Sequence, residues 1–257
     1  MTTPVVSAER RWTRRPRGAP LVIGHRGAMA LELENTLAAF RRARADGADG
    51  VELDVCRCAT GEIVVFHDDD LTRLAGRKER IRELPLAALR EVRLAGGQTI
   101  PLLDEVLDEL GDDFLVNVEL KATALFHGQR LAPAVAALLV RRGTGERVLV
   151  SSFNPFALAR FRLAAPALPS ALLFEAGSHF FARADARRLL RPRALHPERV
   201  LVTAARVEAW HAAGYAVNVW TVNEPAELLR LAELGVDGLV TNDPGAARRV
   251  LAGQSAS

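Results

Sequence analysis

Short apolar runs alternate along the chain with longer segments whose apolar residues recur at helical spacing. The run at 21–26 is typical of a buried strand, and the segment 34–47 places Leu37, Ala38 and Phe40 on one helical face. The same succession continues towards the C-terminus. Further extended runs are expected at 50–57, 63–68, 114–121, 147–153, 170–176, 194–201, 216–222 and 236–242, and further helices at 130–143, 154–165, near 180–191, up to Gly214, at 224–235 and from Pro244.

This alternation predicts one α/β domain with a parallel sheet. Parallel strands need crossover connections, which are nearly always right-handed, and about eight such units close into a (β/α)8, or TIM, barrel. The typical length of about 250 residues for that barrel agrees with a chain of 257. A doubly wound open sheet is the alternative. It would carry a glycine-rich phosphate-binding turn after the first strand, and the sequence has none there.

The alternation of expected strands and helices also indicates where the barrel begins and ends and where it is interrupted. We expect the barrel over residues 19–252 and a flexible basic tail over residues 1–18. The segment 69–100 is too long for a simple loop, so we interpret it as a small insertion at the rim, where loops grow without disturbing the core. Within the barrel, Asn154 and Pro155 predict the start of a helix, because Asn is a good N-cap and Pro fits the first turn.

Composition excludes several classes of protein. Hydrophobic residues make up 49% of the chain and charged residues 25%, which is typical of a folded domain with a large core. No apolar run approaches the roughly 20 residues that span a bilayer, so we expect no stable membrane insertion. The N-terminus has no apolar stretch of a secretory signal, which favours a cytoplasmic protein. The net charge of +3 is a weak argument for a nucleic-acid partner, and we expect none. The oligomeric state stays open.

The expected strands share one unusual property, which is that their ends are polar. The active sites of α/β barrels lie at the carboxyl ends of the strands. Buried polar groups cost free energy unless they pair with one another, a metal or a ligand. The polar strand ends therefore predict a site, and they comprise His25, Arg26, Glu52, Asp54, His67, Asp68, Glu119, Lys121, Ser151, Ser152, Glu175, His196, Trp220, Thr241 and Asn242.

Three carboxylates in this set favour a metal. Glu52 and Asp54 are two residues apart on a strand and share a face, and Glu119 ends the next barrel strand. Carboxylates placed side by side repel one another, and a divalent cation relieves that repulsion. Oxygen ligands without a thiol indicate a hard cation, namely Mg²⁺, Ca²⁺ or Mn²⁺. The alternative is a set of ion pairs with Arg26, Arg57 or Lys121.

Other candidates surround the carboxylates. His25 and His67 would face the same mouth, where two imidazoles serve as general base and general acid near neutral pH. Lys121 shares a face with Glu119, in a chain whose only other lysine is Lys78. Trp220 either covers the apolar part of a substrate at the rim or packs in the core. His196 is ambiguous, and we assign no role to His127, His179 and His211.

These residues fall within an ordered series of short motifs. A single HRG or ExD motif would be weak, but an ordered set over roughly residues 20–250 is highly specific. The series is GHRG (24–27), ENT (34–36), ELDV (52–55), FHDD (66–69), LTR (71–73), PLLDEVL (101–107), VELK (118–121), SSFNP (151–155), LHP (195–197), VWTVN (219–223) and GVDGLVTNDP (235–244). In this series the chain resembles the glycerophosphodiester phosphodiesterases.

The resemblance implies a metal-dependent TIM barrel that hydrolyses glycerophosphodiesters to sn-glycerol 3-phosphate and an alcohol. It implies attack by the glycerol 2-hydroxyl on phosphorus, followed by hydrolysis of the cyclic phosphate. By resemblance, the site residues are Glu52, Asp54 and Glu119 on Mg²⁺ or Ca²⁺, His25 and His67 as the acid/base pair, and Arg26 and Lys121 on the phosphate.

Two alternatives stay open beside this hypothesis. The first is a lysophospholipase-D-like activity on lysolipids, which would need an apolar rim; Leu125, Phe126, Phe180 and Phe181 are the candidates for one. The second is a non-catalytic barrel that only binds phosphodiesters. It predicts the loss of a histidine or a carboxylate, and all of them are present.

Overall fold

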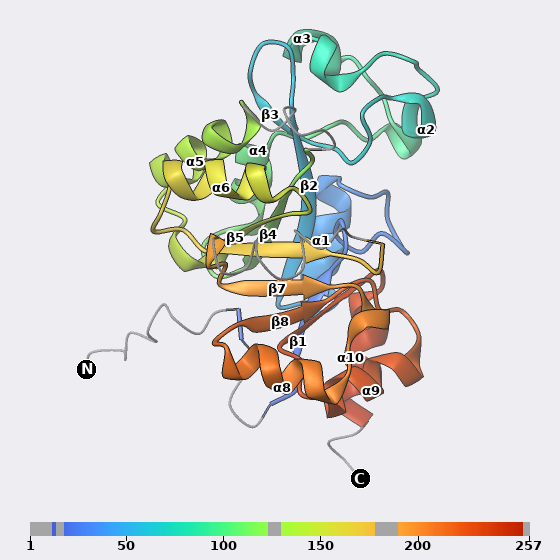
Figure 1. The fold of residues 1–257 in the computed structure, drawn as a ribbon. Helices are drawn as coiled ribbons and strands as arrows, with labels where there is room; N and C mark the ends of the chain where they lie inside the picture. Colours follow the sequence, from blue (N-terminus) through green and yellow to red (C-terminus); the bar gives the residue numbers. More distant parts are fainter. Residues whose placement is uncertain (1–11, 14–17, 123–129, 178–189, 254–257) are drawn as a thin grey trace, which may run out of the picture.

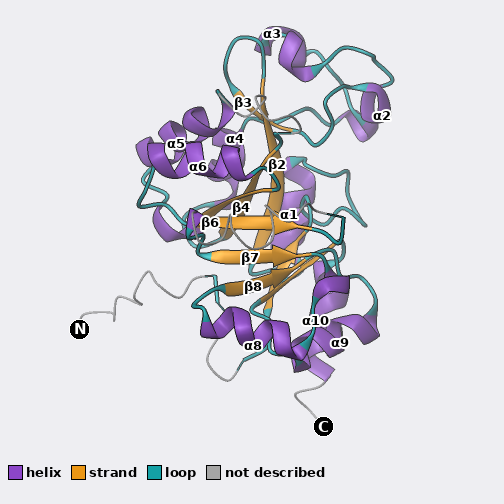
Figure 2. Ribbon diagram, in the orientation of Figure 1, coloured by secondary structure: helices purple, strands orange, loops and turns teal. Residues whose placement is uncertain are grey.

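Eight parallel strands close into a ring in this computed structural model, which describes residues 12–13, 18–122, 130–177 and 190–253. Within these residues the strands are hydrogen-bonded in the order β1, β9, β8, β7, β6, β5, β4 and β2, and β2 pairs back with β1. Figure 2 shows the strands in the middle of the molecule with helices around them. The expected (β/α)8 barrel is thus confirmed. In the described part of the chain no helix is long and apolar enough to cross a membrane.

The elements agree closely with the alternation in the sequence. The strands are β1 (Leu21–Gly24), β2 (Gly50–Arg57), β3 (Ile63–Val65), β4 (Leu115–Leu120), β5 (Val148–Ser152), β6 (Ser170–Phe174), β7 (Ala194–Pro197), β8 (Ala216–Val219) and β9 (Gly238–Thr241). The helices are α1 (Leu37–Ala45), α2 (Thr72–Ala75), α3 (Leu86–Arg90), α4 (Leu103–Leu110), α5 (Leu131–Arg141), α6 (Pro155–Ala164), α8 (Ala204–Ala212), α9 (Pro225–Glu233) and α10 (Pro244–Gly253). As predicted, the Asn154 side chain caps α6 by accepting from two backbone N–H groups. The helix expected near 180–191 lies largely outside the described residues.

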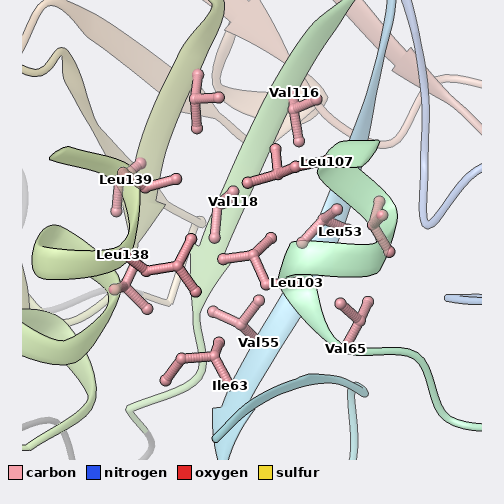
Figure 3. Packing of buried hydrophobic residues seen from close by; sticks show 14 of the residues in the cluster. Leu53, Val55, Ile63, Val65, Leu103, Leu107, Val116, Val118, Leu138 and Leu139 are labelled. Carbon is pink, nitrogen blue, oxygen red and sulfur yellow. The ribbon is translucent and has the colours of Figure 1, made fainter. Parts of the chain in front are cut away.

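Alternating side chains on the strands separate the core from the site. On β2, Leu53 and Val55 point outwards, while Glu52 and Asp54 lie on the opposite face. On β4, Val116 and Val118 likewise join the apolar layer that α4 and α5 complete; Figure 3 shows this packing, with Leu103, Leu107, Leu138 and Leu139 against the two strands. A second apolar layer joins β6 to β9 with α8, α9 and α10. The strands' inward faces are thereby free to carry polar groups.

The run expected as a strand at 63–68 has a different partner from the others. β3 ends at Val65 and pairs antiparallel with the far end of β2, so it forms a hairpin that projects beyond the ring. The chain then returns towards the mouth of the barrel, where the Phe66 N–H donates to the Asp54 carbonyl at 3.0 Å. His67 therefore lies in the loop after β3 rather than on a barrel strand.

The segment 69–100 packs with Cys58, Val64 and Phe66 around an apolar cluster that is separate from the barrel core. It contains α2, α3 and the short 3-10 turns η2 (Ile81–Glu83) and η3 (Ala95–Gly97), and Figure 1 shows α2 and α3 at one end of the molecule, away from α8 and α9. The cluster consists of Cys58, Val64, Phe66, Leu71, Ile81, Leu89, Val92, Leu94 and Ile100.

Trp12 covers the end of the barrel opposite the mouth, where the strands begin. Its side chain is 2% exposed and packs with Leu21, Leu115 and other residues near the amino ends of the strands. The indole Nε1 donates to the Glu146 carbonyl at 2.9 Å. The residues on either side of 12–13 in the N-terminal segment lie outside the described part of the chain.

Candidate active site

A pocket of about 250 Å³ opens at the carboxyl ends of the barrel strands. Of the seven residues that received roles by resemblance, six line it, as does Trp220, and the seventh, Asp54, lies beneath it with 1% of its surface exposed. The lining residues are His25, Arg26, Glu52, His67, Asn117, Glu119, Lys121, Phe153, Leu173, Glu175, His196, Trp220, Thr221 and Val240.

The register of β2 and β4 brings the three carboxylates together. Asp54 is the direct neighbour of Glu119 across the two parallel strands, and Glu52 follows on the same face. One carboxylate oxygen from each of the three lies within 4.8 Å of the others. All three residues are buried, with exposed fractions of 8% or less. The structure thus brings together the three carboxylates that the sequence placed at neighbouring strand ends.

None of the lysine and arginine side chains in the described residues forms an ion pair with Glu52. Asp54 has Arg26 Nε at 3.2 Å and Lys121 Nζ at 3.5 Å, and Lys121 also donates to Glu119 at 2.9 Å. Glu52 accepts only a weaker bond, from the Arg26 backbone N–H at 3.1 Å, and its Oε1 is buried with no hydrogen-bond partner. Three carboxylates thus face two cations, and the ion pairs that sequence reasoning kept as an alternative satisfy only two of them.

The pKa values of the three carboxyl groups reflect this excess of negative charge. Burial and the negative charges of Asp54 and Glu119 raise the pKa of Glu52 well above its ordinary value. Burial and Asp54 raise the pKa of Glu119 to about 7, against the opposing effect of Lys121. At Asp54 the burial effect is outweighed by Lys121 and Arg26, and its pKa is lowered. A divalent cation among the three oxygens would offset the excess negative charge, and such hard oxygen ligands suit Mg²⁺, Ca²⁺ or Mn²⁺.

His25 follows β1 directly, with its ring held by a single acceptor. Nδ1 lies 2.7 Å from Oδ1 of Asn242, and because an amide oxygen only accepts, Nδ1 carries the proton. Nε2 then lies 3.9 Å from Glu52. Burial and the adjacent Arg26 charge lower the pKa of His25. The ring is therefore neutral near pH 7, with Nε2 available to accept a proton.

His67 faces the pocket from the loop after β3. Its Nδ1 donates to Oδ1 of Asp68 at 2.6 Å, since an ionised carboxylate can only accept. Asp68 in turn accepts from Arg73 Nε at 2.7 Å, and this arginine belongs to α2 in the 69–100 segment. The hydrogen bond to Asp68 occupies Nδ1, so Nε2 is the ring nitrogen that can interact with a substrate.

The loop between β1 and α1 has an unusual backbone conformation that brings Arg26 and Asn35 to the site. Arg26 and Asn35 both have positive φ values, 50° and 56°, which non-glycine residues adopt at a cost. Between them, Gly27 has φ 88°, and a Cβ there would lie 2.6 Å from the Ala39 backbone. In this conformation Asn35 Nδ2 donates to the Asp54 carboxylate at 2.8 Å and Asn35 Oδ1 accepts from the Asp54 backbone N–H, so Asn35 holds both the side chain and the backbone of Asp54.

Aromatic side chains form the other wall of the pocket. Trp220 is half-buried, and its Nε1 donates to the His196 carbonyl at 2.8 Å, which fixes the plane of the indole. Phe153 packs edge-on against it, with ring centroids 5.4 Å apart. Burial lowers the pKa of His196 to about 3, so this ring is a neutral part of the pocket wall. Trp220 thus lines the pocket and packs edge-on against Phe153.

Comparison with known proteins agrees with the site. A family model described as the glycerophosphoryl diester phosphodiesterase family matches residues 25–246. The chain belongs to this family. A glycerophosphodiester phosphodiesterase of Caldanaerobacter subterraneus subsp. tengcongensis is 34% identical over 240 residues, which cover 87% of this chain and 94% of that relative. A probable glycerophosphodiester phosphodiesterase 2 of Mycobacterium tuberculosis is 32% identical over 248 residues, or 91% of each chain.

Solved structures of phosphodiesterases show the same barrel. A putative glycerophosphoryl diester phosphodiesterase from Silicibacter pomeroyi superposes with a TM-score of 0.86 at 29% identity, over 96% of this chain and 98% of that one. An Oleispira antarctica phosphodiesterase, solved in complex with the product sn-glycerol-3-phosphate, superposes with a TM-score of 0.82 at 28% identity, over 91% and 97%.

Four site residues of this phosphodiesterase received no role from the sequence. Glu34 and Asn35 stand in the ENT motif, Arg73 ends the LTR motif, and Asn242 is a strand-end residue. Each of them holds a predicted site residue: Glu34 accepts from Arg26 Nη1 at 2.8 Å, and the other contacts are given above. The motifs themselves were the available signal. They lie in loops, where no periodicity shows which way a side chain points.

Some sequence-based assignments cannot be placed. His127 and His179 lie outside the described residues, as do Leu125, Phe126, Phe180 and Phe181, the candidates for an apolar rim. His211 lies on α8, where its Nε2 contacts Asp237 at 2.8 Å, and it does not line the pocket of the phosphodiesterase.

Glu34→Gln should destabilise the phosphodiesterase at neutral pH and hardly at acid pH. Burial opposes ionisation of Glu34, but Arg73 and Arg26 outweigh it and lower its pKa from 4.5 to about 2. A carboxyl whose pKa is lowered by folding stabilises the native state above its ordinary pKa, and this contribution is lost as the pH falls from about 4.5 towards 2. Thermal midpoints of the two proteins, measured between pH 7 and 3, should converge below pH 4.5. A gap that does not change with pH would contradict a stabilising charge on Glu34.

Proposed function

We propose that the protein hydrolyses glycerophosphodiesters to sn-glycerol 3-phosphate and an alcohol, with a divalent cation held by Glu52, Asp54 and Glu119. The observation that carries the proposal is a buried carboxylate cluster with excess negative charge, flanked by two histidines in one pocket. Membership of the family and the named activities of the relatives support the choice of substrate. The product complex of the Oleispira antarctica neighbour supports glycerol 3-phosphate as the product.

The charges of the pocket suit a phosphodiester anion. Arg26 and Lys121 both line the pocket and would contact the phosphate oxygens, in addition to their bonds to Asp54. A bound divalent cation would act as a Lewis acid and stabilise the charge that develops on the phosphoryl oxygens. Mg²⁺ and Ca²⁺ are the expected ions, and Mn²⁺ has the same ligand preference.

The two histidines differ in a way that suits opposite proton transfers. His25 is neutral, and its Nε2 takes the proton of the glycerol 2-hydroxyl as that oxygen attacks phosphorus. The bond between phosphorus and the alcohol oxygen breaks, and His67 gives a proton to the departing oxygen. His67 acts through Nε2, because its Nδ1 donates to Asp68. In the second step water opens the cyclic phosphate, and the two rings exchange their roles.

The aromatic wall would contact the carbon atoms of the substrate. Trp220 and Phe153 form a rigid pair beside the pocket, and such a surface suits the glycerol carbons or the near part of the alcohol. Headgroup preference depends on the rim above this wall.

Release of the headgroup alcohol from a panel of substrates tests the proposal, and glycerol 3-phosphate is measured as the second product of the glycerophosphodiesters. The panel holds glycerophosphocholine, glycerophosphoethanolamine and a lysophosphatidylcholine, each with Mg²⁺, Ca²⁺ or Mn²⁺. We expect turnover of the glycerophosphodiesters. The matched control is the 2-deoxy analogue, 3-hydroxypropyl phosphocholine, which lacks the attacking hydroxyl and should not be cleaved. Cleavage of the lysolipid alone would favour the lysophospholipase-D-like alternative, and no cleavage in any combination would overturn the proposal.

A further inference from the structure

Arg73 forms hydrogen bonds with Asp68 and Glu34, two carboxylates that hold site residues from separate parts of the chain. Its guanidinium donates Nε to Asp68 Oδ2 at 2.7 Å, and Nη1 and Nη2 to the two oxygens of Glu34 at 2.8 and 2.7 Å. Asp68 holds His67, and Glu34 holds Arg26 through Nη1 at 2.8 Å. One unbroken chain of hydrogen bonds thus leads from His67 to Arg26, and Arg26 in turn forms an ion pair with Asp54.

The geometry of this bridge needs a guanidinium. Three donors of Arg73 are used on two carboxylates, with a paired contact to Glu34, which is the fork geometry that a lysine ammonium cannot reproduce. Most exposed ion pairs contribute little, because solvent screens both partners. Here Glu34 is 7% exposed and Arg73 covers it from outside. The carboxylate therefore has little water to replace a lost partner.

The origin of Arg73 matters as much as its contacts. It lies on α2, in the 69–100 segment, while Glu34 and Arg26 lie in the loop between β1 and α1. The segment packs around the separate apolar cluster described above, which includes Leu71, two residues before Arg73. The bridge is thus a direct polar connection between this segment and the mouth of the barrel.

We infer that Arg73 is a positioning residue, which sets the orientation of both His67 and Arg26 through Asp68 and Glu34. Arg73 touches no reacting atom in this assignment. It fixes the carboxylates that aim the proton donor and the phosphate-binding guanidinium at one substrate. The inference rests on the proposed function for the roles of His67 and Arg26, and on the distances above for the bridge itself.

Kinetics of Arg73→Met and Arg73→Lys test the inference, with Arg77→Met as the matched control. Arg77 lies in the same segment and pairs only with the exposed Glu79. On glycerophosphocholine we expect Arg73→Met to lower kcat about tenfold, as is common when a group that holds a site residue is removed, with a smaller change in KM. Arg73→Lys should recover only part of the loss, and Arg77→Met should keep kcat within twofold. The double variant Arg73→Met/Asp68→Asn should lose less activity than the product of the two single losses, because part of the effect of Arg73 passes through Asp68 to His67.

A spectroscopic measurement separates this inference from the proposed function. The ring nitrogens of ¹⁵N-histidine report the tautomer of His67 without any substrate, and His67→Ala assigns its signals. At a pH where the ring is neutral, we expect the proton on Nδ1 in the wild type and in Arg77→Met, and a mixture of tautomers in Arg73→Met. A shifted tautomer in an enzyme that releases no glycerol 3-phosphate would overturn the proposed function and keep the positioning role. An unchanged tautomer with an unchanged kcat, or full recovery by Arg73→Lys, would overturn the positioning role.

Discussion

Removal of divalent cations with EDTA should abolish the release of glycerol 3-phosphate, and Mg²⁺, Ca²⁺ or Mn²⁺ should restore it. The reason lies in the charge of the site. Glu52 has no cationic partner among the described lysines and arginines, and its Oε1 is buried without a hydrogen bond. Without a cation, the cluster cannot hold three ionised carboxylates beside a substrate that is itself an anion. Full activity in a sample shown to be free of metal would sink the assignment.

Glu52→Gln is the matched variant for this experiment. It keeps the size of the side chain and removes the charge that Arg26 and Lys121 leave unbalanced, so activity should stay low at any metal concentration. A ligand that binds only the native state raises stability by about 2.7 kcal/mol at 100 times its dissociation constant. Addition of metal should therefore raise the thermal midpoint of the wild type and hardly that of Glu52→Gln. Equal midpoint shifts in both proteins would place the metal elsewhere.

Replacement of His25 or His67 by Ala should lower kcat by about 100-fold or more, because each removes one proton transfer. Their geometry predicts a difference between them. Under the proposed mechanism, His67, which Asp68 holds, protonates the departing alcohol, and His25 accepts the proton of the attacking hydroxyl. A substrate with a 4-nitrophenol leaving group needs no such proton. His67→Ala should thus recover most of its activity on glycerophospho-4-nitrophenol, and His25→Ala should not.

His211→Ala serves as the control for these variants, because His211 pairs with Asp237 on α8 and does not line the pocket. It should change kcat on either substrate by less than threefold. If His25→Ala or His67→Ala changed only KM, the ring would bind substrate without transferring a proton. If both variants recovered equally on the activated substrate, the separate roles would be wrong.

Much of the site was predictable because it is built on strands. The two-residue period of β2 places Glu52 and Asp54 on one face whatever the rest of the chain does, and parallel strands bring their ends to one rim. The bounds of β2 agree with the expected run to the residue. The partner of a strand is a different matter, because local alternation does not encode it. For that reason the antiparallel pairing of β3 was not foreseen.

The supports of the site escaped prediction for a physical reason. Asn35 reaches Asp54 only because the backbone adopts a positive φ at Arg26 and at Asn35 itself. Such conformations are stabilised by tertiary contacts and leave no periodic trace in the sequence. The burial of Trp12 could not be predicted from the basic N-terminal segment either, because the residues that cover it come from strands distributed over the whole barrel.

The separate apolar cluster of the 69–100 segment has a consequence for cooperativity. Elements with their own small core can open locally while the larger core stays closed. Under the proposed role of Arg73, such an opening would withdraw the guanidinium from Glu34 and Asp68 and release His67 while the eight-stranded ring stays intact. The temperature at which the enzyme loses activity would then be set by this segment, and it would lie below the temperature at which the barrel melts.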